Sequence, residues 1–304
     1  MQKIIPHIWF DTQAKEAAEF YASVFPNSKV SSSTILNNTP SGDCEIMTFN
    51  VMGQDFMAIS AGPDFKPNPS ISFMVNFDPS KMDNAEEELD EIWKKLSDGG
   101  MVAMELGEYP FSKKYGWIQD KYGVSWQLIL TDPDGEDRPA VIPSFLFVTE
   151  GCDKAEEATD FYLSVFKNSK RGIVARYPAG AEAEGGKEGS IMFTDFTLES
   201  QRFTATDASS DMHKFAFDEG ISLVVHCDTQ EEIDYYWEKL SAAPESEQCG
   251  WLKDKYGVSW QIVPSIMNEM MTCGDQEKID RVTEAFIKMK KFDIVKLNEA
   301  YNGK

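Results

Sequence analysis

The first half of the chain alternates short apolar runs with amphipathic helical stretches. Ile4–Phe10 is rich in β-forming residues and predicts a strand. Apolar residues then recur at helical spacing from Ala17 to Phe25, which predicts a helix. Three further strands are expected, the last two joined by a tight hairpin at Gly53: Val30–Leu36, Glu45–Met52 and Gln54–Ser60. This order predicts a strand–helix–three-strand (βαβββ) module.

The same plan follows a second time before the middle of the chain. Ile71–Phe77 predicts an opening strand, and Glu86–Leu96 predicts a helix with one apolar face. Three more strands are expected at Val102–Leu106, Tyr115–Asp120 and Val124–Leu130. One half of the chain therefore holds two βαβββ modules.

The second half repeats the first. The block Gly116–Gln127 returns as Gly250–Gln261, with ten of its twelve residues identical. The charged, turn-rich segment Thr131–Pro139 predicts a linker between the two copies. We therefore expect an α+β protein of two tandem domains, at residues 1–137 and 138–274. Each domain has two βαβββ modules, and the two halves are expected to pack as an internal pseudo-dimer.

Residues 275–304 match nothing in the first half. Apolar residues at helical spacing predict a helical tail: Ile279, Val282, Phe286, Met289, Ile294, Leu297 and Tyr301. Short helices gain most of their stability by burying an apolar face. The tail must therefore dock either on its own chain or on another subunit, which leaves a homo-oligomer formed through the C-terminal helices as an alternative.

Charge and cysteine usage narrow the class of protein. The formal net charge of −22 argues against nucleic acid and anionic membranes as partners, because both require a basic surface. No apolar run is long enough to span a membrane, and the first residues do not form a signal peptide. The five cysteines are scattered, without a CxxC pair, so we expect a cytoplasmic protein without disulfides.

Several separated motifs together resemble one known family. They are a Phe-Tyr-x-x-Val-Phe helix at residues 20–25, an Ile-Ser strand at Ile71 and Ile221, and the Tyr-Gly-Val-Ser-Trp-Gln endings. With the doubled βαβββ plan, they resemble the PhnB-like branch of the vicinal oxygen chelate superfamily, which includes glyoxalase I, extradiol dioxygenases and bleomycin-resistance proteins. This branch carries the label "demethylubiquinone methyltransferase-like". The sequence has no glycine-rich strand–turn–helix cradle for S-adenosylmethionine, so the residues do not support that activity.

The resemblance implies open barrels, each formed around a cleft, with the cleft residues on the first and last strands of the modules. The residues that it implies are His7, Ser60, Ser72 and Gln127 in the first half and Ser144, Asp207, Ser222 and Gln261 in the second. Two-residue alternation supports a shared polar face, because Ser72, Met74 and Asn76 point to one side of their strand.

The side chains at these positions are poor ligands for a metal ion. A divalent ion prefers imidazole and carboxylate ligands, and each half offers one such group, His7 or Asp207. Glutamine stands at Gln127 and Gln261, where metal-binding relatives carry glutamate. No cofactor is therefore expected, and a divalent metal is the alternative.

Three functions are consistent with these residues. We favour a small-molecule-binding protein of the bleomycin-resistance type, with His7 as a hydrogen-bonded cleft residue. The alternatives are a metal-dependent lyase, isomerase or dioxygenase, and a structural or partner-binding protein. His213 and His226 are expected to be structural or exposed, and Cys249 structural, because the first half has Tyr115 in its place.

Overall fold

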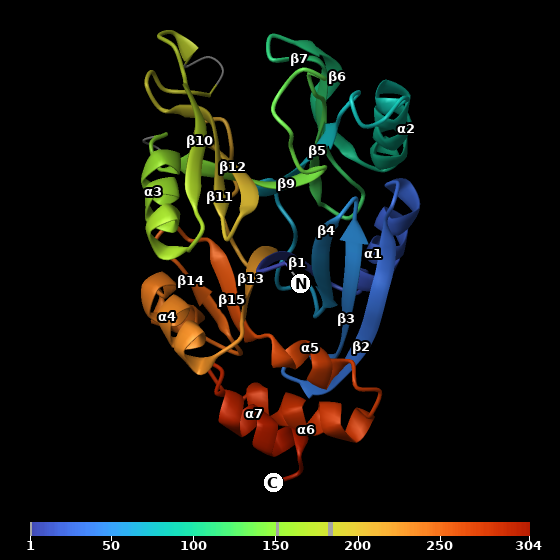
Figure 1. Cartoon of the computed structure of the whole chain (residues 1–304), viewed down its shortest axis with the longest axis vertical. Helices are drawn as coiled ribbons and strands as arrows, with labels where there is room; N and C mark the ends of the chain where they lie inside the picture. Colours follow the sequence, from blue (N-terminus) through green and yellow to red (C-terminus); the bar gives the residue numbers. More distant parts are fainter. Residues whose placement is uncertain (1, 150–151, 182–184) are drawn as a thin grey trace.

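The computed structural model describes residues 2–149, 152–181 and 185–304 (Figure 1). The first half contains β1 (Ile4–Phe10), α1 (Ala14–Val24), β2 (Lys29–Thr39), β3 (Gly42–Val51), β4 (Gln54–Ser60), β5 (Ile71–Phe77), α2 (Ala85–Ser97), β6 (Met101–Tyr109), β7 (Ser112–Gln119) and β8 (Ser125–Leu130). The second half contains β9 (Val141–Thr149), α3 (Ala155–Val165), β10 (Lys170–Arg176), β11 (Ile191–Leu198), β12 (Gln201–Ser209), β13 (Ile221–Cys227), α4 (Gln230–Leu240), η2 (Pro244–Ser246), β14 (Trp251–Lys253) and β15 (Ser259–Pro264). After β15 comes α5 (Ile266–Met271), and the tail adds α6 (Gln276–Phe286) and α7 (Ile294–Tyr301).

These strands form two mixed sheets, and each sheet takes strands from both halves. Sheet A has the order β14-β15-β13-β1-β4-β3-β2, and sheet B has the order β10-β11-β12-β9-β5-β8-β7-β6. The halves join through two antiparallel strand pairs, β1 with β13 and β5 with β9, which set His7 opposite Ser222 and Ser72 opposite Ser144. The predicted α+β fold and the internal pseudo-dimer are confirmed. The domain boundary near residue 137 stays a prediction, because each sheet contains strands from both sides of it.

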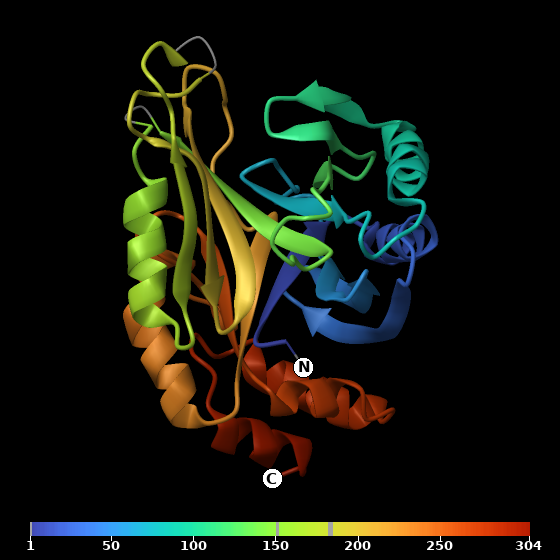
Figure 2. The same cartoon turned by 45° about the horizontal axis from the view of Figure 1, so that its top comes forward.

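One continuous apolar core contains residues of both halves and lies between the sheets and the helices that cover them. Helices α1 and α2 cover the strands of the first half, and α3 and α4 cover those of the second, on opposite sides of the molecule (Figures 1 and 2). In the first half, the fully buried Trp126 ring packs against Tyr21 at 5.2 Å and Phe25 at 4.7 Å between ring centroids. Burying these aromatic surfaces contributes to holding the module together.

The repeated sequence block has a structural explanation. Asp120 is buried, and its carboxylate accepts hydrogen bonds from the backbone N–H groups of Tyr122 and Val124 and from the indole of Trp126. Asp254 makes the same set of bonds in the second copy and also accepts from the Tyr162 hydroxyl. A buried carboxylate must be satisfied in this way. The block is therefore a tied turn that places the last strand of each half.

The fourth module departs from the predicted βαβββ plan. In the first half, residues 98–115 between α2 and the repeated block hold β6 and the start of β7, whereas the corresponding residues 241–249 are too few for a hairpin and contain η2. Sheet A consequently has no described counterpart of β6 beside β14. The chain after α6 lies next to the start of β14 instead. Two backbone hydrogen bonds place it there: Cys249 N–H donates to the Met289 carbonyl, and Gly250 N–H donates to the Lys290 carbonyl.

The C-terminal helices dock on their own chain, against sheet A (Figure 1). Val282 and Leu297 are fully buried there, in a second apolar cluster that includes Leu36 of β2 and Met267 of α5. Asp275 and Asp293 begin α6 and α7 by accepting backbone hydrogen bonds from residues three positions later. Among the described residues, no helix has the length and apolar content needed to cross a membrane.

Candidate functional site

A pocket of about 330 Å³ lies on the inner face of sheet A. Alternation along the strands directs every second side chain into it, including Ile5, His7 and Trp9 of β1 and Val224 and His226 of β13. Helices α5 and α6 close its other side, with Met267, Asn268, Met271 and Thr272 at α5 and Phe286 at the end of α6. Pockets for small ligands measure roughly 300–1,000 Å³ and are mostly apolar. We call this cavity the sheet A pocket.

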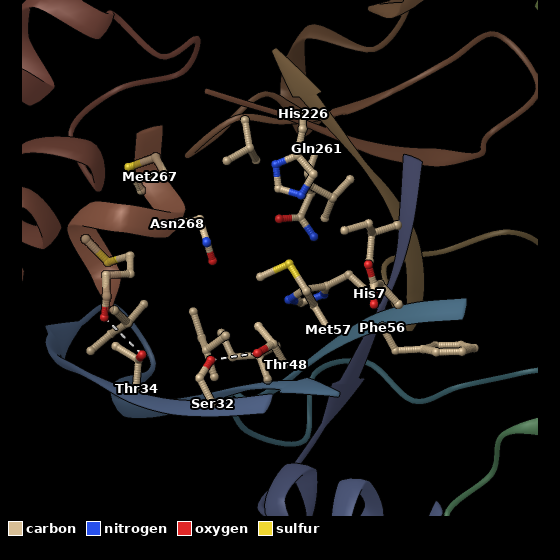
Figure 3. Close-up of a pocket in the computed structure, with 18 of the residues that line it drawn as sticks. His7, Ser32, Thr34, Thr48, Phe56, Met57, His226, Gln261, Met267 and Asn268 are labelled. Atoms are coloured by element: carbon tan, nitrogen blue, oxygen red, sulfur yellow. Dashed lines mark hydrogen bonds between the residues drawn. The ribbon is translucent and has the colours of Figure 1, made fainter. Parts of the chain in front are cut away.

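One end of the sheet A pocket is polar, and its groups lack protein partners. Figure 3 shows His7, His226 and Gln261 converging there. His7 is 3% exposed and His226 is 8% exposed, and among the described residues His7 Nδ1 and both ring nitrogens of His226 have no hydrogen-bond partner. Gln261 donates from Nε2 to Ser222 Oγ at 2.9 Å. Buried polar groups are normally paired, so three unpaired ring nitrogens at one place indicate a binding site.

Both histidines are uncharged at neutral pH. Burial lowers the pKa of His7 to about 4, because the imidazolium loses its hydration. Burial also lowers the pKa of His226 to about 4, with a smaller contribution from Lys3. A neutral imidazole has one N–H donor and one nitrogen acceptor. The polar end of the pocket therefore offers both kinds of hydrogen bond without a charge.

The rest of the pocket wall is satisfied and nearly uncharged. Ser32 and Thr48 share a hydrogen bond of 2.6 Å, and Thr34 donates to the Met271 carbonyl at 3.0 Å (Figure 3). No lysine or arginine lines the pocket in the described part of the chain, and its one carboxylate, Asp55, accepts from Asn50. The pocket therefore has no group to neutralise an anion.

The corresponding groups in sheet B are paired with one another. Gln127 accepts from the Tyr115 hydroxyl at 2.8 Å, and its Nε2 donates to Ser72 Oγ at 2.8 Å and lies 3.5 Å from Ser144 Oγ. Asn76, which corresponds to His226, donates to the Pro139 carbonyl at 2.7 Å. Tyr115 is 5% exposed and fills the position that corresponds to Cys249 in sheet A. The same strand positions are thus closed in sheet B and open in sheet A.

Comparison with known proteins agrees with the repeat. The family described as 3-demethylubiquinone-9 3-methyltransferase matches twice, at residues 2–129 and 139–263. This chain belongs to that family. A solved PhnB protein from Bacillus cereus is 38% identical, with a TM-score of 0.38, and the match covers 43% of this chain and all of that one. A glyoxalase I mutant from Zea mays has a TM-score of 0.50 at 11% identity, over 88% of this chain and 97% of that one. No curated protein gives a significant match.

The fold groups the candidate site residues differently from the sequence. The sequence grouped them by half. Strand pairing between halves instead joins His7 to Ser222 and Gln261 in sheet A, and it joins Ser72 and Gln127 to Ser144 in sheet B. The two clefts of this family member are therefore each built from both halves.

Two of the expected cleft residues serve helix starts instead. Ser60 Oγ accepts from the N–H of Ala14, the first residue of α1. Asp207 accepts from the N–H groups of Lys154 and Ala155 at the start of α3, and also from Ile191 N–H. An acceptor at a helix start satisfies N–H groups that have no partner within the helix. Neither side chain lines the sheet A pocket.

Two residues that do line the pocket were assigned no functional role from the sequence. His226 was expected to be structural or exposed, yet it lies on the same face of β13 as Ser222, at even spacing. Cys249 was compared with Tyr115 and expected to be structural, but the smaller side chain leaves space in the pocket. Among the described residues, no group of three or more His, Cys, Asp or Glu is placed to hold a metal ion.

Proposed function

We propose that this family member binds a small, largely apolar molecule in the sheet A pocket, without a resident metal. The observation that carries the proposal is the contrast between the two clefts. Gln127 and Asn76 in sheet B are satisfied by protein groups, whereas the nitrogens of His7 and His226 in sheet A have no described partner. Unpaired buried groups cost free energy, and a ligand that pairs them removes that cost.

The donor set supports binding without a metal. Gln261 and Ser222 are neutral oxygen and nitrogen donors that already share a hydrogen bond, and Asp207, a carboxylate implied by the resemblance, is occupied at α3. A divalent ion would find two imidazoles, and in the described part of the chain no third His, Cys, Asp or Glu is placed with them to complete a metal site. The carboxylate of the pocket, Asp55, accepts a hydrogen bond from Asn50. We also propose a reducing location such as the cytoplasm, which the five unpaired cysteines support.

A substitution that blocks the mouth of the pocket tests the binding proposal. Asn268 and Glu269 are neighbouring exposed residues on α5, but only Asn268 lines the pocket (Figure 3). We expect the native chain and Glu269→Trp to bind the neutral fluorophore N-phenyl-1-naphthylamine with one site. Asn268→Trp should abolish that site, because the indole fills the mouth.

Equal binding by the two tryptophan variants would place the dye elsewhere and would contradict the proposal, as would an absence of binding by the native chain. Elemental analysis of the same preparation tests the metal. About one equivalent of zinc, nickel or manganese per chain, retained through gel filtration, would show that the donor set was misjudged.

A further inference from the structure

The chemistry of the polar end restricts what can bind there. His7 and His226 are neutral, so each presents one donor and one acceptor. The carbonyl oxygen of Gln261 adds an acceptor, because the Gln261 amide bonds only through Nε2 to Ser222 among the described contacts. The polar end therefore presents both N–H donors and lone pairs to a ligand.

Few ligand groups can satisfy such a mixed set. A carbonyl oxygen or a carboxylate only accepts hydrogen bonds, so it would leave the acceptors of the imidazoles and of Gln261 unpaired. A carboxylate would in addition be buried without a cation, since no lysine or arginine lines the pocket in the described chain. A hydroxyl group donates one hydrogen bond and accepts two. One small uncharged atom can therefore pair with both kinds of group in the site.

The walls around the polar end favour a flat apolar body. The His7 ring meets the edge of Trp251 at 5.6 Å, and Trp251 lies 6.2 Å from Trp9, all measured between ring centroids. Met57, Met267 and Met271 add flexible side chains that adapt to the shape of a ligand. Aromatic and methionine side chains together make good contact surfaces for a ring.

We propose that the ligand is an uncharged, largely apolar alcohol or phenol whose hydroxyl group bonds to His226 at the polar end of the pocket. This inference rests on the proposed function, because it requires the sheet A pocket to be a binding site. It adds the chemical class of the ligand and assigns recognition to His226, a residue outside the metal-ligand positions of the superfamily.

Three probes of one shape test this inference on the full-length protein. They are 2-naphthol, naphthalene and 2-naphthoate, and their affinities are measured at pH 7.5 by quenching of tryptophan fluorescence, since Trp9 and Trp251 line the pocket. We expect 2-naphthol to bind roughly two- to tenfold more tightly than naphthalene, the range that one net hydrogen bond supplies. Naphthoate should bind more weakly than naphthalene, because its charge has no partner.

A matched pair of variants assigns the preference to the residue. His226→Phe keeps a ring of similar size without nitrogen atoms, so it should bind naphthalene as well as the native chain does and lose the preference for naphthol. His213→Phe is the control, because His213 is half-buried in a loop outside this pocket. Its preference should be unchanged.

The outcomes separate the two proposals. If naphthalene and naphthol bind equally to the native chain, or naphthoate binds most tightly, the hydroxyl inference is wrong while the binding function stands. If His226→Phe keeps the preference, His226 is not the recognition residue. If no probe binds the native chain, the proposed function fails as well. The probe series on the native chain decides the ligand class even if the variant does not fold.

Discussion

The two central glutamines occupy equivalent strand positions but should respond differently to the same substitution. Replacing Gln127 by leucine removes an acceptor from Tyr115 and a donor from Ser72, whose side chains are 5% and 1% exposed. Replacing Gln261 removes one bond to Ser222, and the Ser222 hydroxyl still has the His7 carbonyl at 3.5 Å. The rest of the Gln261 side chain faces the pocket.

The expected magnitudes follow from these contacts. Leaving a buried polar group unpaired costs about 1–3 kcal/mol, so Gln127→Leu should lower the free energy of unfolding by about that amount. Gln261→Leu should cost below about 1 kcal/mol, because it leaves no fully orphaned group and adds apolar surface to an apolar pocket. Removing both partners of a buried hydrogen bond costs less than removing one. Tyr115→Phe should therefore restore part of the stability lost in Gln127→Leu.

Urea unfolding followed by tryptophan fluorescence measures these differences as shifts of the transition midpoint. The matched pair is its own control, since both substitutions are chemically identical and lie on corresponding strands, β8 and β15. Equal losses for the two variants, or a larger loss for Gln261→Leu, would refute the claim that the groups around Gln127 satisfy one another while those around Gln261 face an open pocket. So would a Tyr115→Phe change that adds to the loss in Gln127→Leu.

Two further predictions concern the tail and the histidines. Deleting residues 275–304 uncovers Leu36 and one side of the pocket. The shortened chain should therefore bind more of the dye 1-anilinonaphthalene-8-sulfonate and unfold at a lower urea concentration. Unchanged unfolding and sedimentation would show that the tail contributes nothing to stability or assembly. The pKa of histidine is near 6.5 in the unfolded chain, whereas the folded protein lowers the pKa of His226 to about 4. The stability that depends on neutral His226 is therefore fully present above pH 6.5 and should be lost as the pH drops from 6.5 to 4. His226→Phe should lose about 3 kcal/mol less than the native chain over that interval, and equal losses would mean that His226 is not held neutral.

Strands bounded by turn residues were predictable from the sequence. Ile4–Phe10, Gln54–Ser60 and Ile71–Phe77 have the bounds expected, because each is a short apolar run that ends at a turn or a proline-rich loop. The β2–β3 hairpin extends further than expected, to Thr39 and from Gly42. Its polar tip is exposed on both faces, so hydrophobic alternation gives no signal there.

Sequence patterns located part of the site. Of the expected cleft residues, His7 and Gln261 line the sheet A pocket, whereas Ser60 and Asp207 bind helix starts. Alternation correctly placed Ser72 and Asn76 on one face of β5. The same rule applied to β13 would have placed His226 on the face of Ser222, so the signal for His226 was present in the sequence. The pairing of β1 with β13 joins residues more than two hundred positions apart. Periodicity within one strand carries no information about such a partner.

The two copies are most alike where they maintain the fold and differ where the pocket forms. Asp120 and Asp254 tie the identical blocks by the same hydrogen bonds, so that identity reports structure. The differences that matter lie on the inner faces: Ser144 against His7, Asn76 against His226 and Tyr115 against Cys249. At each of these positions, the sheet A residue either lacks a hydrogen bond that is made in sheet B or adds an imidazole ring with an unpaired nitrogen. One cleft of the duplicated chain is thus closed by its own side chains, with the Tyr115 hydroxyl bonded to Gln127, whereas Cys249 and Gln261 line the pocket at the corresponding positions of sheet A.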